Sequence, residues 1–408
     1  MAFALKVAVW VCFGAVAYNY VAYPILLFLL TRLVQAKCDL SFLLRRKSRR
    51  CSATLNGLPR VAILISAFNE EAFIEARVKN ALEINYPSEL AEILIGLDAP
   101  TDSTAQILSW VQSPRVRVWA FPRRRGKLAV VADLAQRTSA DILVCTDADQ
   151  MFEPNCVRNL VRHFADPEVG AVSGEEIRVA LAGADPAAES LYWHYESALK
   201  ILESRLNCLH SANGCLYAIR RALFQPRPGL IVEDFQLPLE LRFQGYRIVY
   251  DPEAITLGEI APTFTSQFER RVRLGAGNFQ TLFRNPGYLN PLKGLPAFAY
   301  WSHRVLRWVT PLLLAIAFIS TLGLLWNPVC LGLFAAQCAF YALALLGYWR
   351  KKRGRLAGVC RAPLYFCAMN LALLLGLFRY LSGRQSVAWA ATPRRMPGPI
   401  IPGTSTKR

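Results

Sequence analysis

Residues 142–149 read ILVCTDAD, an apolar and β-branched run that ends in two aspartates, Asp147 and Asp149. The run predicts a short buried strand. Two carboxylates two residues apart, at the end of such a strand, form a hard oxygen site. Mg²⁺ binds one or two carboxylates and shares the rest of its shell with phosphates. The alternative is a solvated turn in which an aspartate caps the next helix.

Three further runs predict strands that alternate with helix-length segments, namely Val61–Ser66, Glu92–Leu97 and Val116–Ala120, with helices near 70–84, 102–112, 126–138 and 154–165. Such alternation predicts an α/β domain with a mostly parallel sheet over residues 55–265. Ligands of open parallel sheets lie beyond the carboxyl ends of the strands. Residues 67–71, 98–102 and 147–149 should therefore lie along one edge.

Other polar residues fit a site at this edge. Asp98 ends a predicted strand and is a candidate acceptor for hydrogen bonds from a base or ribose, while Asp102 or Ser103 suits a helix cap. Residues 121–127 read FPRRRGK, and the lysine, Lys127, opens a helix, which suits a diphosphate. A solvated basic loop is the alternative. Glu233-Asp234 precedes another helix, where a carboxylate can take a proton from a sugar hydroxyl or simply cap the helix.

Long apolar runs flank the α/β segment. Residues 7–30 form a nearly uncharged run of 24, enough to cross a bilayer, and the alternative of a cleaved signal peptide would have a shorter apolar core. The resulting division is a transmembrane helix at 1–35, amphipathic helices at 266–307, a transmembrane hairpin at 308–349 and a third membrane segment at 362–381. The Pro- and Gly-rich composition of 392–408 predicts a poorly ordered tail.

Basic residues cluster beside the apolar runs, at 45–50 and 350–361, and the net charge of the chain is +18. Basic loops stay cytoplasmic, which predicts an N-terminus outside the cell and a cytoplasmic α/β domain. The tail after 381 is also basic, so the topology of the last segment stays open. The clustering at membrane flanks argues against a nucleic-acid binder. The eleven cysteines form no CxxC pair, so a disulfide framework and a zinc site are not predicted.

Taken in order, residues 61–71 (VAILISAFNEE), the Asp98 turn, RRRGK, DAD, residues 232–234 (VED) and a QxxR stretch at 267–270 resemble the membrane-bound inverting glycosyltransferases of family 2. That group includes cellulose, hyaluronan and poly-N-acetylglucosamine synthases and ceramide glucosyltransferase. The resemblance covers roughly residues 60–280. It implies a GT-A-like fold, that is, a Rossmann-like cytoplasmic domain flanked by transmembrane helices.

The resemblance also implies roles for single residues. Asp234 would be the catalytic base, and Asp147 and Asp149 would bind Mg²⁺ or Mn²⁺. The donor, an activated UDP-sugar, would be contacted by Ala67, Asn69, Glu71, Asp98, Lys127, Arg270 and also Asp147. The acceptor would be contacted by Asn213, Gly214, Glu233 and Gln267. Residues 389–394 match a gating segment of the polymer synthases only loosely.

One departure concerns the acceptor. The tryptophan of the family's QxxRW motif is Arg271 here, and a guanidinium stacks on a sugar less well than an aromatic ring. The resemblance implies a plasma-membrane enzyme that extends a polysaccharide, while Arg271 favours transfer of a single sugar to a lipid. Rival hypotheses are an inactive sugar-nucleotide-binding scaffold and a transporter subunit. Homo-oligomerisation and an export or accessory partner stay open.

Overall fold

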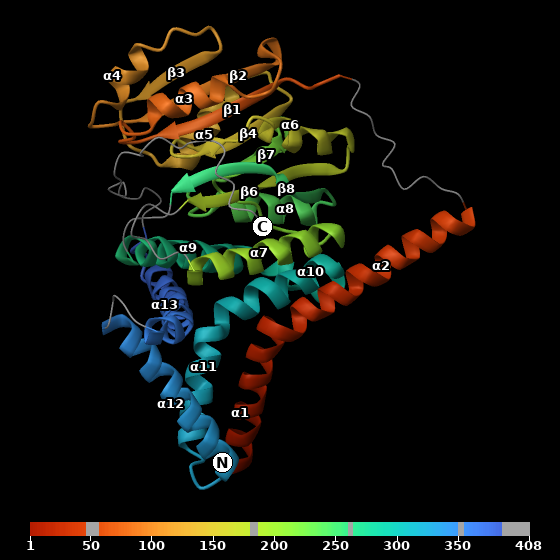
Figure 1. Ribbon diagram of the computed structural model, residues 1–408, viewed down its shortest axis with the longest axis vertical. Coiled ribbons are helices and arrows are strands. Elements are labelled where there is room, and N and C mark those ends of the chain that lie inside the picture. Colours follow the sequence, from red (N-terminus) through yellow and green to blue (C-terminus); the bar gives the residue numbers. More distant parts are fainter. Residues whose placement is uncertain (46–56, 180–186, 260–263, 350–354, 386–408) are drawn as a thin grey trace.

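The computed structural model describes residues 1–45, 57–179, 187–259, 264–349 and 355–385. The basic stretch 46–50, the tail 392–408 and the segment 389–394 lie outside these residues. Figure 1 shows an α/β domain at one end of the molecule and a bundle of long helices at the other. A layer of helices that includes α7 and α9 lies between the two parts.

The α/β domain contains one eight-stranded sheet with the order β3-β2-β1-β4-β7-β6-β8-β5. The first four of these are parallel, β7 is antiparallel to both β4 and β6, β6 and β8 are parallel, and β5 is antiparallel to β8. The strands are β1 (Val61–Ala67), β2 (Ala91–Asp98), β3 (Val116–Phe121), β4 (Ile142–Asp147), β5 (Met151–Phe152), β6 (Val169–Val179), β7 (Leu216–Arg220) and β8 (Arg247–Glu259). The four strands predicted from the sequence are confirmed, and the α/β fold class with them.

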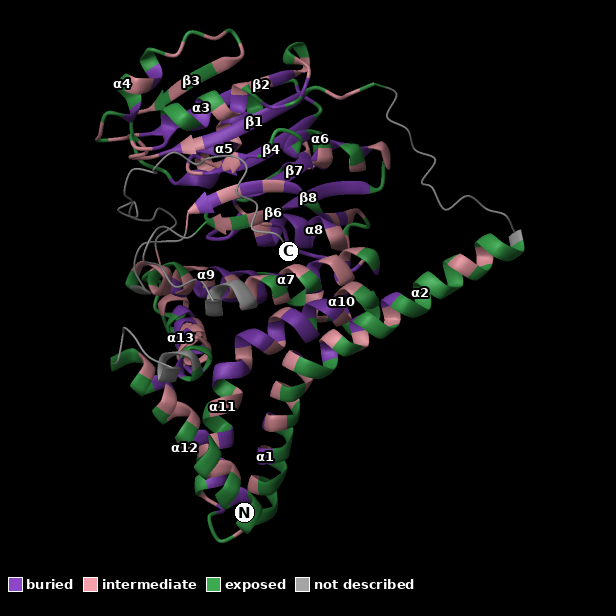
Figure 2. Cartoon of the chain, viewed as in Figure 1, coloured by how far each residue is buried: buried purple, intermediate pink, exposed green. Residues whose placement is uncertain are grey.

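Two apolar layers cover the faces of the sheet because side chains of a strand alternate between its faces. Ile63 and Ile65 of β1 pack on one side, and Ala62 and Leu64 on the other. The first layer comes from α3 (Ile74–Leu82), α4 (Thr104–Ser109) and α6 (Cys156–Val161), and the second from α5 (Lys127–Gln136) and α8 (Glu233–Phe243). Figure 2 shows the strands of this core as mostly buried.

The carboxyl ends of the central strands lie at one edge. In the parallel register, Ser66 of β1 is opposite Asp147 of β4, and Ala67 is opposite Leu97, the residue before Asp98. The three segments predicted to share an edge therefore do so.

Four helical stretches are long and apolar enough to cross a membrane, namely Ala2–Leu44, Leu295–Leu322, Pro328–Trp349 and Val359–Leu381. They comprise α1 (Ala2–Ala17), η1 (Tyr18–Ala22), α2 (Tyr23–Arg45), α10 (Leu295–Ala299), η7 (Tyr300–Val305), α11 (Leu306–Leu322), α12 (Pro328–Trp349) and α13 (Arg355–Leu381). Large apolar side chains such as Trp10, Ile319 and Trp349 are more than half exposed. Such a surface is expected to contact lipid acyl chains.

The N-terminal helix is longer than the predicted segment 1–35, because it continues to Arg45. No Gly or Pro interrupts residues 25–45, and Gln35 donates to Asp39 one turn later at 2.9 Å. The helix bends near the π-helical turn η1, so that α2 leaves the bundle obliquely (Figure 1). The predicted membrane segment at 362–381 belongs to one continuous helix, α13, which runs through Pro363 and Asn370.

The helix α7 (Ala187–Arg205) lies under the sheet, next to α9 (Phe264–Arg284). Short 3₁₀ turns complete the chain at 88–90, 162–165, 221–223, 286–289 and 291–293. An apolar cluster that includes Phe235, Phe279, Tyr300 and Trp308 joins α8 and α9 to the membrane helices. The α/β domain is therefore packed directly on the helical bundle.

Replacing Gly376 of α13 by valine is expected to destabilise the protein by about 1–3 kcal/mol through overpacking. A Cβ at this glycine would lie 2.7 Å from Ala276 N and 2.8 Å from Val272 O, so α9 and α13 would have to separate. Thermal unfolding in detergent measures the effect. Gly332→Val is the matched control, because a Cβ at Gly332 of α12 would meet nothing within 4 Å. An equal loss of thermal stability in both variants would contradict the close packing of α9 and α13 at Gly376.

Candidate active site

Lys127, the first residue of α5, lies at the centre of a charged cluster at the carboxyl edge of the sheet. Its Nζ lies 2.6 Å from Asp147 Oδ1 and 3.4 Å from Glu233 Oε1, and it donates to the carbonyl oxygen of Gly214 at 2.6 Å. Burial lowers the pKa of Lys127, but Asp147 and Glu233 more than offset this and raise the pKa above its usual value. The ammonium group therefore stays charged and connects three segments that are distant in sequence.

Asp234 lies beside this cluster in the first turn of α8. A Cβ at Gly214 would lie 2.8 Å from Asp234 Oδ2, so any larger residue there would displace the Asp234 carboxylate. Burial, followed by repulsion from Glu233, raises the pKa of Asp234 to about 6, while Lys127 and Arg273 act in the opposite direction. A partly buried carboxylate with a raised pKa suits a general base.

Asp98 fixes the basic loop that leads to Lys127. Its two carboxylate oxygens accept hydrogen bonds from the backbone N–H groups of Arg125 and Gly126, each at 2.8 Å, and the residue is buried. Gly126 has φ +89, a conformation that side chains with a Cβ rarely adopt. Asp98 therefore positions Lys127 in this structure, and its contact with a base or ribose stays a prediction.

Asn69 and Glu71 hold the loop that follows β2. Asn69 has φ +54, its Nδ2 donates to Thr101 Oγ1 at 3.0 Å, and its Oδ1 accepts from Thr101 N at 2.8 Å. Glu71 accepts from Ser103 N at 3.0 Å. Ala67, at the end of β1, is buried. These three residues therefore shape the edge near Asp98, and their contact with a nucleotide is untested.

The DAD turn begins at the end of β4, and the carboxylates of Asp147 and Asp149 are both partly exposed there. The Asp147 side chain is 32% exposed and bonds to Lys127 through one oxygen. Asp149 is also partly buried, and both carboxylates lie close enough to Arg77 to raise its pKa, although burial lowers that pKa to about 10 overall. Among the described residues, no group of three or more His, Cys, Asp or Glu side chains could hold a metal by itself. Two carboxylates fit a hard divalent ion whose other ligands come from diphosphate and water.

The QxxR stretch lies on α9. Gln267 is partly buried and Arg270 is exposed. Burial raises the pKa of Glu176, but Arg178 and, to a smaller extent, Arg270 outweigh this and lower it. Arg273, about one turn further, was predicted only as one of several arginines of this stretch that could reach a diphosphate, and was not singled out. It lies near Glu233 and Asp234, although burial and the neighbouring Arg270 lower its own pKa. The only sequence signal for Arg273 is the run of arginines at 270–273.

Arg271, which replaces the motif tryptophan, packs on aromatic rings from another helix. Its guanidinium lies 5.3 Å from the ring of Tyr192 and 5.5 Å from that of Trp193, and it donates to Tyr365 OH at 3.4 Å. Aromatic side chains are therefore present beside this motif, although they come from α7 and α13.

Asn213 and Gly214 belong to a segment that passes between the sheet and α7. Asn213 N donates to Ser173 Oγ at 2.9 Å, and the Asn213 side chain donates to Gly174 O and accepts from Lys200. The neighbouring Ala212 N donates to the carbonyl oxygen of Asp234 at 2.8 Å. Lys200 was also not predicted, since a lysine in a helix carries no local signal of such a contact.

Comparisons with known proteins indicate the same family that the sequence resembles. The family model described as "Glycosyl transferase family 2" matches residues 62–223. Poly-beta-1,6-N-acetyl-D-glucosamine synthase of Staphylococcus aureus (strain COL) is 22% identical over 278 residues, which cover 65% of this chain and 66% of that protein. The enzyme of the same name from Staphylococcus epidermidis is 21% identical over 234 residues, or 55% of this chain and 56% of that protein. The chain thus spans less than two thirds of these relatives' length, 66% of the first and 56% of the second.

Among solved structures, the mannosyltransferase PcManGT of Pyrobaculum calidifontis, determined in complex with GDP-Man and Mn²⁺, superposes with a TM-score of 0.67 and 20% identity. The superposition covers 94% of this chain and all of that one, and at this identity it supports the fold alone. Residues 62–223 thus match the model of glycosyltransferase family 2, and the chain is similar over 65% of its length to an enzyme named as a polysaccharide synthase and has a GT-A-like fold.

Proposed function

We propose that this protein is a membrane-embedded inverting glycosyltransferase that moves a sugar from a UDP-sugar to a growing polysaccharide. The observation that carries the proposal is the charged cluster around Lys127. There the lysine lies beside the carboxylates of Asp147, Glu233 and Asp234, at the carboxyl edge of a domain that matches the family 2 model. The relatives that are poly-N-acetylglucosamine synthases support a polysaccharide product.

In the proposed mechanism, Asp234 removes the proton from an acceptor hydroxyl, whose oxygen attacks the anomeric carbon opposite the leaving diphosphate. Configuration therefore inverts in a single displacement. Lys127 and the arginines of α9 stabilise charge on the diphosphate. Asp147 and Asp149 would hold Mg²⁺ or Mn²⁺, which would neutralise the leaving group as a Lewis acid.

The decisive experiment measures release of nucleoside diphosphate by the purified protein in detergent, with Mg²⁺ or Mn²⁺, across a panel of UDP-sugars. GDP-mannose belongs in the panel because PcManGT was solved with it. Release with one donor identifies the sugar. Nucleotide binding without release with any donor would favour the inactive scaffold, and failure to bind any nucleotide would contradict the proposal.

A second candidate function is the transfer of one sugar to a lipid acceptor. Arg271 favours it, because the motif tryptophan that would stack on a polymer is absent from α9. Product size decides between the two functions. A series of product lengths supports polymerisation, whereas a single product that is extracted into organic solvent together with the lipid supports one addition.

The transfer rate is expected to fall as the pH drops through about 6. The raised pKa of Asp234 means that its carboxylate is protonated below that value and can no longer accept a proton. The rate constant should decline about tenfold per pH unit in the acid range and level off above pH 7. A pH profile of kcat/KM measures this, and a profile without an inflection between pH 5 and 7 would contradict Asp234 as the base.

We also propose that the protein is a multi-pass protein of the plasma membrane, with the N-terminus outside and the α/β domain cytoplasmic. The charge distribution in the sequence and the four apolar helices support this orientation. The bilayer is thus a structural partner of the chain.

A further inference from the structure

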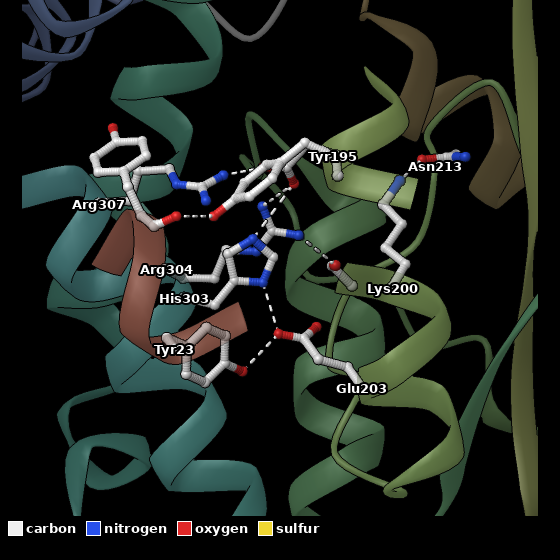
Figure 3. Close-up of polar contacts among 11 residues, drawn as sticks. Tyr23, Tyr195, Lys200, Glu203, Asn213, His303, Arg304 and Arg307 are labelled. Atoms are coloured by element: carbon white, nitrogen blue, oxygen red, sulfur yellow. Dashed lines mark hydrogen bonds and ion pairs between the residues drawn. The ribbon is translucent and has the colours of Figure 1, made fainter. Parts of the chain in front are cut away.

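A buried polar network lies where the α/β domain meets the membrane helices (Figure 3). Glu203 of α7 accepts hydrogen bonds from Tyr23 OH at 2.9 Å and from His303 Nδ1 at 2.6 Å. All three side chains are fully buried. Burial raises the pKa of Glu203, but His303 outweighs this and lowers it to about 2, so the carboxylate is charged.

A second acid of α7, Glu196, lies about two turns before Glu203 on the same face of the helix and continues the network. It pairs with Arg307 and lies 3.5 Å from Arg304 Nη1, and it is also almost fully buried. Burying ionised groups costs several kcal/mol each unless they are paired, and replacing such a network by apolar side chains often stabilises a protein. An apolar cluster already packs the α/β domain against the membrane helices at this interface. The buried ionic network is therefore not needed to hold the two parts together, which points to a further role.

Two π-helical turns meet at this network. The turn η1 lies in the N-terminal helix and η7 lies just before α11, and Tyr18 OH is 2.8 Å from Ser302 Oγ, which links the two. Such π-turns inside α-helices occur frequently at functional sites. In η7 the turn ends with His303, Arg304 and Val305, so it helps to set the direction in which the two polar side chains point.

Arg304 is the part of the network that reaches the active site. Its Nη2 donates to Ser211 Oγ at 2.9 Å. The next residue, Ala212, donates its backbone N–H to the carbonyl oxygen of Asp234 at 2.8 Å. Two residues later, Gly214 faces the Asp234 carboxylate and its carbonyl accepts from Lys127. The segment 211–214 is therefore held from the membrane side by Arg304 and from the active-site side by Lys127.

We infer that Arg304 is a positioning residue, which acts through Ser211 to fix the 211–214 segment against Asp234 and so sets the placement of the acceptor hydroxyl. This inference rests on the proposed function of Asp234 as the base. It predicts that a change in the membrane helix α11 or its neighbours alters transfer without altering donor binding.

The test compares Arg304→Met, Ser211→Ala and the double variant in the full chain in detergent. Because Arg304 acts through Ser211, each single variant should lower kcat for transfer by about tenfold, with the donor KM unchanged, and the double variant should lose little more than either one. Arg304→Lys, which can still donate to Ser211, should recover part of the rate. Full activity of Ser211→Ala, or multiplicative losses in the double variant, would overturn the inference.

Arg307→Met is the matched control. Arg307 lies one turn further along α11 and also pairs with Glu196, but none of its hydrogen bonds reaches the 211–214 segment in the part of the chain that the structure describes. It should therefore leave kcat close to wild type even if it lowers thermal stability. A loss of kcat equal to that of Arg304→Met would mean that the network has only a structural role.

Hydrogen–deuterium exchange separates this inference from the proposed function, because it needs no turnover. In Arg304→Met and Ser211→Ala, peptides that cover 208–216 and the start of α8 should exchange faster, while those of β1 and β2 should not change. Unchanged exchange in 208–216 would overturn the inference whatever the enzyme transfers. Absence of transfer by wild-type protein, together with faster exchange in the variants, would contradict only the proposed function.

Discussion

Asp234→Asn is expected to reduce sugar transfer by about 10²–10⁴-fold, the range that general-base catalysis contributes. Asparagine keeps the shape of the side chain beside Gly214 but cannot accept the proton of the acceptor hydroxyl. Nucleotide binding should remain, because Lys127 still pairs with Asp147 and Glu233. The measurement is initial rate with saturating donor, together with nucleotide affinity by calorimetry.

Glu240→Gln is the control for this prediction. Glu240 lies on the same helix, α8, and accepts a hydrogen bond from Gln236 at 2.8 Å, away from Lys127. It should retain most of the activity. If Asp234→Asn transferred sugar at the wild-type rate, another group would have to be the base, and Glu233 would be the next candidate because it lies 3.4 Å from Lys127.

Asp149→Asn is the second change with a large expected effect, a loss of transfer of about 10²-fold or more. Metal ions supply several kcal/mol of charge stabilisation in such reactions, and Asp147 and Asp149 of the DAD turn are the proposed oxygen ligands. Removal of divalent ions with EDTA should have the same effect on the wild type, and added Mn²⁺ or Mg²⁺ should reverse it. The metal concentration for half-maximal activity should rise in the variant.

Asp141→Asn is the matched control for the DAD turn. Asp141 lies just before the opposite end of the same strand, β4, where its side chain accepts from Arg60 N at 3.0 Å. It should not change the metal dependence. Activity of the wild type that survives complete removal of divalent ions would contradict the metal proposal, and the cations near Lys127 would then have to stabilise the leaving group alone.

The sequence by itself determined the α/β domain and the edge of the sheet at which the candidate site lies. The strands are short apolar runs with polar residues where they end, and this local alternation determines which residues become strands and where each strand stops. Parallel strands joined by helices place their carboxyl ends together, so the meeting of Ala67, Asp98 and Asp147 also followed from the pattern. The long apolar runs gave the membrane helices in the same way, since helix length follows from bilayer thickness.

Only the tertiary structure decided what each polar residue contacts at that edge. The predicted donor-binding residue Asp98 accepts from the loop before Lys127, and Asn69 holds Thr101, contacts that depend on loop conformations with positive φ at Gly126 and Asn69. Hydropathy also could not predict where the N-terminal helix ends or that it bends at η1, because it indicates which residues are buried and not the direction of the helix axis.

The contacts that complete the candidate site join residues far apart in the chain. Lys127 and Gly214 are separated by 87 positions, and Ser211 and Arg304 by 93. No local period or spacing encodes such pairs, because they exist only after α5, α8 and η7 have packed around the same segment. The sequence therefore determined which residues could do the chemistry, and the packing of distant helices decided which of them face one another.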